Sequence, residues 1–153
     1  MPDALQVTME YAAAFEETYA DDDWTRLERF FAPDAVYEVR GGPLACRLEG
    51  RDAILTGLKK SVDTLDRRCD KRHIKLTDGP HLAETGGGGE VSMSWHASYD
   101  YGDAPRAGFP GRSVALVRDG VIVALRDEYD DAELADFEAW MARYGEGLDG
   151  TYV

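Results

Sequence analysis

This chain of 153 residues has little cysteine and no long hydrophobic run. Cys46 and Cys69 are its only cysteines, and they form no CxxC pair. With no secretory segment ahead of them, we expect reduced thiols and a cytoplasmic protein. No apolar stretch approaches the ~18 residues that a membrane helix requires, so no membrane partner is expected.

Basic residues are also scarce. Lysine and arginine total 17 against 30 aspartates and glutamates, which gives a formal net charge of −13. A field of this sign repels phosphate backbones and anionic lipids, and no nucleic-acid partner is therefore expected. We interpret the charge as a solvated surface in preference to an acidic docking face.

The usual signatures of metal and cofactor binding are missing as well. The three histidines and two cysteines lack the spacing of metal ligands, so no metal site is predicted. The glycine run at residues 86–89 does not precede a predicted helix, and it is therefore neither a phosphate-binding loop nor a dinucleotide fingerprint. We expect no cofactor.

The pattern of apolar residues predicts a single α+β domain over residues 1–153. Three- and four-residue spacing predicts helices, with a flexible tail expected at 146–153. The predicted helices span residues 4–20, 24–31, 51–65 and 131–144. Alternating patterns predict strands at residues 35–40, 44–48, 73–77, 91–101, 113–118 and 121–129. The last two form a hairpin around Asp119-Gly120, whereas residues 102–111 are predicted to be a loop.

Four segments, in this order, resemble one known family: YADDDWTRLERFFAPDAVYEVRGG at 19–42, EGRDAI at 49–54, RHIKL at 72–76 and VALRDEYDD at 123–131. They resemble a SnoaL-like protein of the nuclear transport factor two (NTF2-like) superfamily, in the branch of scytalone dehydratase and the polyketide cyclases. The resemblance implies a cone-shaped α+β barrel, in which a curved antiparallel sheet wraps over the N-terminal helices and encloses a pocket. It also implies a homodimer and acid-base chemistry without a metal.

Asp127 and His73 are the candidate acid-base residues. Asp127 falls on an apolar strand face, where a carboxylate must be paired, solvated or functional. An ion pair with Arg112 or Arg126 is the structural alternative for it. An imidazole such as that of His73 acts as an acid or base near pH 7, but the alternation of its strand turns it away from the apolar face. Both a pocket and a surface position therefore remain open for His73.

Four further positions are candidate site residues. Tyr19 corresponds in its spacing to a tyrosine that scytalone dehydratase uses near its substrate, whereas Tyr37 lies two residues before the position of that family's second tyrosine, which here is Val39. We expect Tyr19 and Tyr37 to polarise or orient a substrate oxygen. Val39 and Phe15 align with the base and the first-helix tyrosine of ketosteroid isomerase, and we expect both to line the substrate pocket. Ala20 stands where scytalone dehydratase carries an acid, so this catalytic set is incomplete.

Trp95 and Tyr99 are expected to form pocket walls for a flat, mostly apolar ligand. The leading hypothesis is thus a cofactor-independent dehydratase, cyclase or isomerase that acts on a small hydrophobic cyclic or polyketide-like molecule. The alternative is a non-catalytic small-molecule-binding or assembly module of the same fold.

Overall fold

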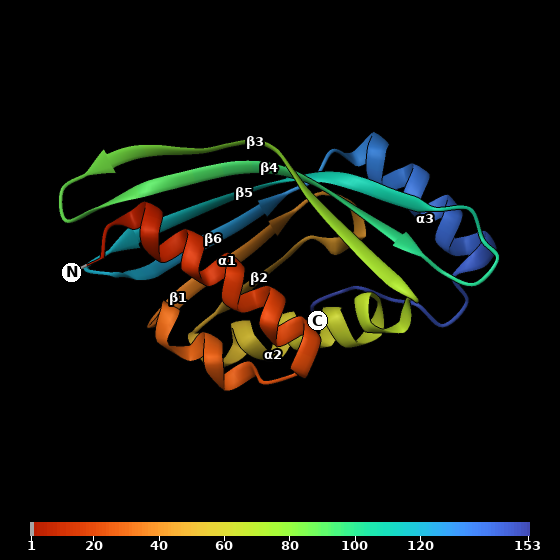
Figure 1. Ribbon diagram of the computed structural model, residues 1–153, viewed down its shortest axis with the longest axis horizontal. Helices are drawn as coiled ribbons and strands as arrows, with labels where there is room; N and C mark the ends of the chain where they lie inside the picture. The colour runs from red at the N-terminus through yellow and green to blue at the C-terminus, as the bar shows by residue number, and fades with distance from the viewer. Residues whose placement is uncertain (1) are drawn as a thin grey trace.

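The computed structural model describes residues 2–153 and confirms the predicted α+β class (Figure 1). Within these residues, three α-helices and three short 3₁₀ segments accompany one six-stranded sheet. The elements are α1 (Ala4–Asp21), η1 (Trp24–Phe30), β1 (Phe31–Arg40), η2 (Gly42–Leu44), β2 (Cys46–Glu49), α2 (Arg51–Thr64), η3 (Asp66–Arg68), β3 (Lys71–Thr85), β4 (Gly88–Asp100), β5 (Ala107–Arg118), β6 (Val121–Glu128) and α3 (Asp131–Tyr144).

Local chemistry sets several boundaries. The Asp3 carboxylate accepts a hydrogen bond from the Gln6 amide and caps α1, while Asp130 caps α3 in the same way through the Glu133 amide. The β5–β6 turn has positive φ angles of 50° at Asp119 and 80° at Gly120. These angles suit a two-residue hairpin, as the sequence predicts.

The strand order is β2-β1-β6-β5-β4-β3. All neighbours are antiparallel except β1 and β6, which run parallel. The sheet is therefore mixed, whereas we expected an antiparallel sheet. This parallel pair brings Val39 opposite Asp127, and the antiparallel β5–β6 pair brings Ser113 opposite Asp127. The hairpin strands β5 and β6 and the distant strand β1 therefore meet at one carboxylate.

Four strands are longer than the sequence predicts: β1 and β4 begin a few residues earlier, and β3 and β5 are extended the most. β3 extends to Thr85 because β4 pairs with it almost throughout, although its exposed residues show no sustained alternation of apolar side chains. β5 begins at Ala107, inside the segment predicted to be a loop. Pro110 is accommodated because β6 pairs with β5 only from Arg112 onward, so the strand has one free edge there.

Helices α1 and α3 pack on the same sheet face. Alternate β4 residues contribute to both core clusters: Val91 belongs to the cluster beneath α1, and Ala97 and Tyr99 belong to the cluster beneath α3. Helix α2 packs against β1. In Figure 1 the long strands β3 and β4 curve over α1, and the space enclosed in this way holds the candidate site.

The segment 146–153 differs from the flexible tail that we expected. It returns to α2, where the Lys60 ammonium group and the Ser61 hydroxyl donate hydrogen bonds to its backbone carbonyls. Among the described residues, none of the helices is both long and apolar enough to cross a membrane.

Candidate functional site

A cavity of about 490 Å³ lies between α1, α2 and the concave face of the sheet. Its walls are mainly apolar and aromatic side chains. They include Tyr11, Phe15, Leu58, Val62, Ile74, Val91, Met93, Trp95, Ala97, Tyr99, Phe109, Leu125 and Tyr129. Met9, Ile74 and Leu76 also contact the cavity and keep exposed surface, so its mouth lies between α1 and β3. A pocket of this kind suits a small, mostly hydrophobic ligand.

Asp127 is the polar centre of the cavity. The Tyr37 hydroxyl donates a hydrogen bond of 2.5 Å to Asp127 Oδ2, and the Ser113 hydroxyl donates one of 2.6 Å to Oδ1. Ser113 in turn accepts a hydrogen bond of 2.9 Å from Trp95 Nε1. A chain of donors from β1, β4 and β5 thus converges on one carboxyl group of β6, whose remaining accessible surface faces the cavity.

Burial raises the pKa of Asp127 above its ordinary value of 3.8, and the hydrogen bonds from Ser113 and Tyr37 oppose that rise. The pKa of Tyr37 is raised well above 10.0, first by burial and then by the charge of Asp127. The phenol therefore stays protonated as a donor at neutral pH. The carboxyl group, by contrast, is set to exchange a proton closer to neutrality than a solvated aspartate does.

Three more phenols surround this centre. Tyr11, Tyr129 and Tyr152 all line the cavity, and the negative charge of Asp127 contributes to a raised pKa for each. The largest cause in every case is burial, which brings the pKa of Tyr152 to about 12. Neutral hydroxyls in an apolar pocket are well suited to bind a polar oxygen of a ligand.

A second polar cluster lies on another part of the wall. Asp66 Oδ2 is 2.7 Å from Arg72 Nε and accepts a hydrogen bond of 3.2 Å from the Tyr99 hydroxyl. Arg72 also donates to Glu16 Oε2 at 2.7 Å, and its guanidinium group lies over the Tyr19 ring. Burial raises the pKa of Asp66, and Arg72 lowers it. The cluster joins α1, η3, β3 and β4 at the cavity edge.

The structure brings most of the predicted residues to the cavity, but not all of them. Asp127, Tyr37, Trp95, Tyr99 and Phe15 line it. The structural alternative for Asp127, an ion pair with Arg112 or Arg126, is not formed, and the partners of the carboxyl group are the hydroxyls of Ser113 and Tyr37.

His73, Tyr19 and Val39 lie outside the lining. His73 Nε2 is 2.9 Å from Asp100 Oδ2, because the neighbours of His73 on β3, Arg72 and Ile74, occupy the cavity face. Val39 is buried in the core, and Tyr19 stacks against Arg72. The catalytic roles of His73 and Tyr19 stay predictions.

Ser113 and Tyr152 were not predicted as site residues. Strand parity offers a signal for Ser113, because it alternates with Ala115 and Val117 on the buried face of β5. No periodic pattern marks Tyr152, which lies beyond the last helix.

A set of metal ligands cannot be named in this structure. Among residues 2–153, no group of three or more histidine, cysteine, aspartate or glutamate side chains is arranged to hold a metal ion.

Comparison with known proteins places this geometry in context. The family described as "SnoaL-like domain" matches residues 12–125. An NTF2-like protein from Burkholderia thailandensis has a TM-score of 0.64 at 19% identity, over 89% of this chain and 97% of that chain. A candidate polyketide cyclase from Xanthomonas campestris has a TM-score of 0.59 at 21% identity, over 88% and 96%.

A third structure, TerC crystallised with polyporic acid, has a TM-score of 0.61 at 15% identity, over 89% and 98% of the two chains. At these identities the similarity establishes the NTF2-like fold alone. No curated protein matches the chain in sequence.

Proposed function

The chain belongs to the SnoaL-like family, and from this premise we propose that it is an enzyme that performs acid-base chemistry without a cofactor. The observation that carries the proposal is the Asp127 carboxyl group, which is half-buried at an apolar cavity and accepts hydrogen bonds from Tyr37 and Ser113. Proton-transferring carboxyl groups typically have such surroundings, because burial moves the pKa toward the working pH.

In this mechanism Asp127 accepts a proton from the substrate and returns it. Return to a different carbon completes an isomerisation, and return to a leaving hydroxyl releases water and completes a dehydration. Tyr37 and Ser113 hold the carboxyl group in one orientation throughout. The remaining phenols, Tyr11, Tyr129 and Tyr152, supply neutral donors for negative charge that develops on a substrate oxygen.

The proposed substrate is a small hydrophobic cyclic or polyketide-like compound. A cavity of about 490 Å³ has room for two or three fused rings, and Trp95, Tyr99 and Phe109 provide flat apolar surface for them. The complex of TerC with polyporic acid supports a small-molecule ligand for this fold. Dehydratase, cyclase and isomerase reactions all fit the same proton transfer.

The test is to screen hydrophobic cyclic compounds by thermal shift and then assay the stabilising compounds for turnover. Asp127→Asn should lower kcat by about 10²-fold or more while the protein stays folded. Glu128→Gln is the matched control, because Glu128 is adjacent but forms an ion pair with Arg112 away from the cavity. Full turnover by Asp127→Asn would contradict the proposal.

A non-catalytic binding module is the second candidate. Two observations favour it: both Asp127 oxygens already accept hydrogen bonds, and the cavity lining of the described residues contains no histidine. The same screen separates the two functions. Compounds that bind tightly and are recovered unchanged would favour the module.

We also propose a homodimer that forms through the sheet between residues 91 and 129. Ser94, His96 and Ser98 lie on the β4 face opposite Val91, Ala97 and the cavity, where a second sheet can pack. Light scattering should give twice the chain mass of 16.9 kDa. A clean monomer mass would contradict this assembly.

A further inference from the structure

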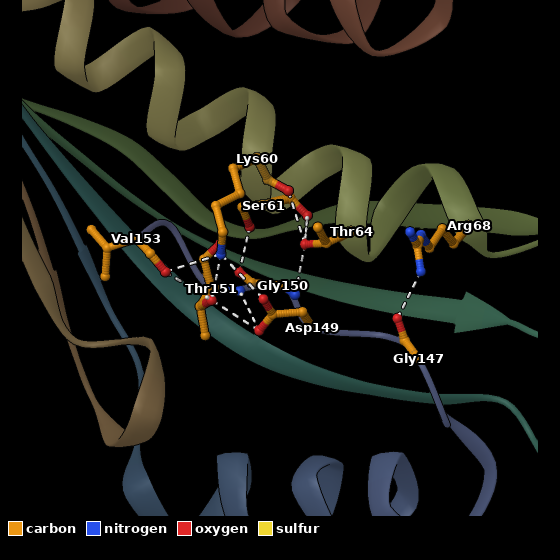
Figure 2. A network of polar contacts seen from close by, with 9 residues as sticks. All are labelled: Lys60, Ser61, Thr64, Arg68, Gly147, Asp149, Gly150, Thr151 and Val153. Carbon is orange, nitrogen blue, oxygen red and sulfur yellow. Dashed lines mark hydrogen bonds and ion pairs between the residues drawn. The ribbon is translucent and has the colours of Figure 1, made fainter.

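The segment formed by residues 146–153 is bound to α2 along most of its length (Figure 2). Lys60 is the main anchor, since its ammonium group donates to Asp149 Oδ2 at 3.1 Å and to Thr151 Oγ1 at 2.8 Å. It also donates to the backbone carbonyls of Thr151 at 3.1 Å and Val153 at 3.0 Å. One lysine therefore holds three residues of the segment.

Backbone contacts complete the attachment. The Ser61 hydroxyl donates a hydrogen bond of 2.5 Å to the Gly150 carbonyl, and the Gly150 amide donates one of 3.0 Å to Thr64 Oγ1. The Asp149 amide donates to the Thr64 carbonyl at 3.1 Å. These bonds satisfy the backbone groups of the buried Gly150 and fix the path of the segment.

This path brings the segment to the cavity wall. Gly150 and Tyr152 both line the cavity. The Tyr152 ring meets the Tyr37 ring edge to face, with centroids 5.5 Å apart and an interplanar angle of 73°. Tyr37 is the residue that donates to Asp127, so the segment contacts the candidate reacting group through one intermediate side chain.

We propose that residues 146–153 seal the cavity against α2 and that Tyr152 is a positioning residue of the Asp127 site. The segment excludes water from the Asp127 carboxyl group. The Tyr152 hydroxyl supports the hydrogen bond that Tyr37 donates to Asp127. The inference rests on the proposed function only in taking Asp127 as the reacting group.

Six side chains surround Asp127. Ser113 of β5 and Tyr37 of β1 lower its pKa through their hydrogen bonds. The charge of Asp127 in turn raises the pKa of Tyr11 of α1, Cys46 of β2, Tyr129 just after β6, and Tyr152. Tyr152 has two separable effects. Its ring and backbone keep water out, which raises the pKa of Asp127. Its hydroxyl is a dipole that stabilises the ionised carboxylate, which lowers the pKa of Asp127.

The two effects predict pKa changes of opposite sign. Tyr152→Phe keeps the wall and removes the hydroxyl, so the pKa of Asp127 should rise. Lys60→Met releases the segment and admits water, so the pKa of Asp127 should fall toward its ordinary value. The measurement is a titration of the ¹³C-labelled carboxyl group of Asp127 by NMR, which requires no substrate.

Matched controls exist for both variants. Tyr144→Phe makes the same substitution on α3, outside the cavity lining. Lys59→Met makes the same substitution one residue away on α2, where Lys59 pairs with Asp22 and Asp63 and not with the segment. Both controls should titrate as the wild type does.

Hydrogen exchange reports directly on the attachment. The amides of Asp149 and Gly150 should exchange about tenfold faster in Lys60→Met, because the loss of the lysine contacts lowers the cost of local opening. Lys59→Met should leave them unchanged. Faster exchange in Lys60→Met without a fall in the pKa of Asp127 would overturn the sealing role. An unshifted titration in Tyr152→Phe would overturn the positioning role.

These outcomes are distinct from the test of the proposed function. Loss of turnover in Asp127→Asn together with wild-type titrations in both segment variants overturns this inference and leaves the enzyme proposal intact. Shifted titrations in both segment variants together with full turnover in Asp127→Asn overturn the enzyme proposal and leave this inference intact.

Discussion

Removal of Arg72 tests how the cavity wall is held together. The Arg72 side chain is only 8% exposed, and it faces the Asp66 side chain, which is 12% exposed, at 2.7 Å. Arg72→Met keeps the apolar stem of the side chain but leaves the Asp66 carboxylate buried without its cation. Loss of one partner from a buried pair destabilises a protein by about 3–5 kcal/mol. For a chain of this size, that corresponds to a fall in Tm of roughly 6–20 °C.

The stability that Arg72→Met loses should depend on pH in a defined direction. Burial already raises the pKa of Asp66 above 3.8, and Arg72 opposes that rise, so Arg72→Met raises the pKa further. A carboxyl group whose pKa is raised on folding contributes its full stability below the unfolded pKa and loses it as pH rises through the folded pKa. The unfolding free energy of the variant should therefore fall furthest below that of wild type at pH 8, and the difference should be smallest near pH 4.

Urea unfolding at pH 8 and pH 4.5 measures both quantities. Arg106→Met is the control, because Arg106 forms an ion pair of the same length, 2.7 Å, with Asp100 but is 58% exposed, and its removal should leave the unfolding free energy close to that of wild type. Asp66→Asn added to Arg72→Met should restore most of the loss at pH 8. An equal loss at both pH values, or one no larger than that of Arg106→Met, would refute the reasoning.

Two further predictions concern the walls and the outer face. A Cβ atom at Gly111 would lie 2.5 Å from the Trp95 ring, so Gly111→Ala should destabilise the protein by about 1–3 kcal/mol in urea unfolding. Gly86→Ala is the control, since nothing lies within 4 Å of a Cβ atom there, and equal unfolding midpoints for the two variants would contradict the clash. His73→Ala breaks a contact with Asp100 outside the cavity and should keep kcat within about twofold of wild type, because the His73 side chain does not line the cavity. A large loss of kcat would contradict this expectation and support the catalytic role predicted for His73.

The candidate site was only partly predictable from the sequence. Strand alternation alone places Asp127 and Tyr129 on one face and Tyr37 on the inner face of β1, because side chains point to opposite sides at successive residues. The same rule turns His73 away from the cavity, which is one of the two positions that the sequence left open for it. The pairing of Tyr37 with Asp127 was not predictable, because it depends on the parallel register of β1 and β6, 90 residues apart.

By itself, the sequence determined the α+β class, the order of helices and strands, and the turn at Asp119-Gly120, since these follow from periodicity and local backbone preference. Only the tertiary structure decided the mixed sheet, the hydrogen bond from Tyr37 to Asp127 and the path of residues 146–153. These features are contacts between segments far apart in the chain. Local patterns do not encode such contacts. The packing of Tyr152 beside Tyr37 depends on the attachment of the segment to α2, and so it could not be predicted from the sequence.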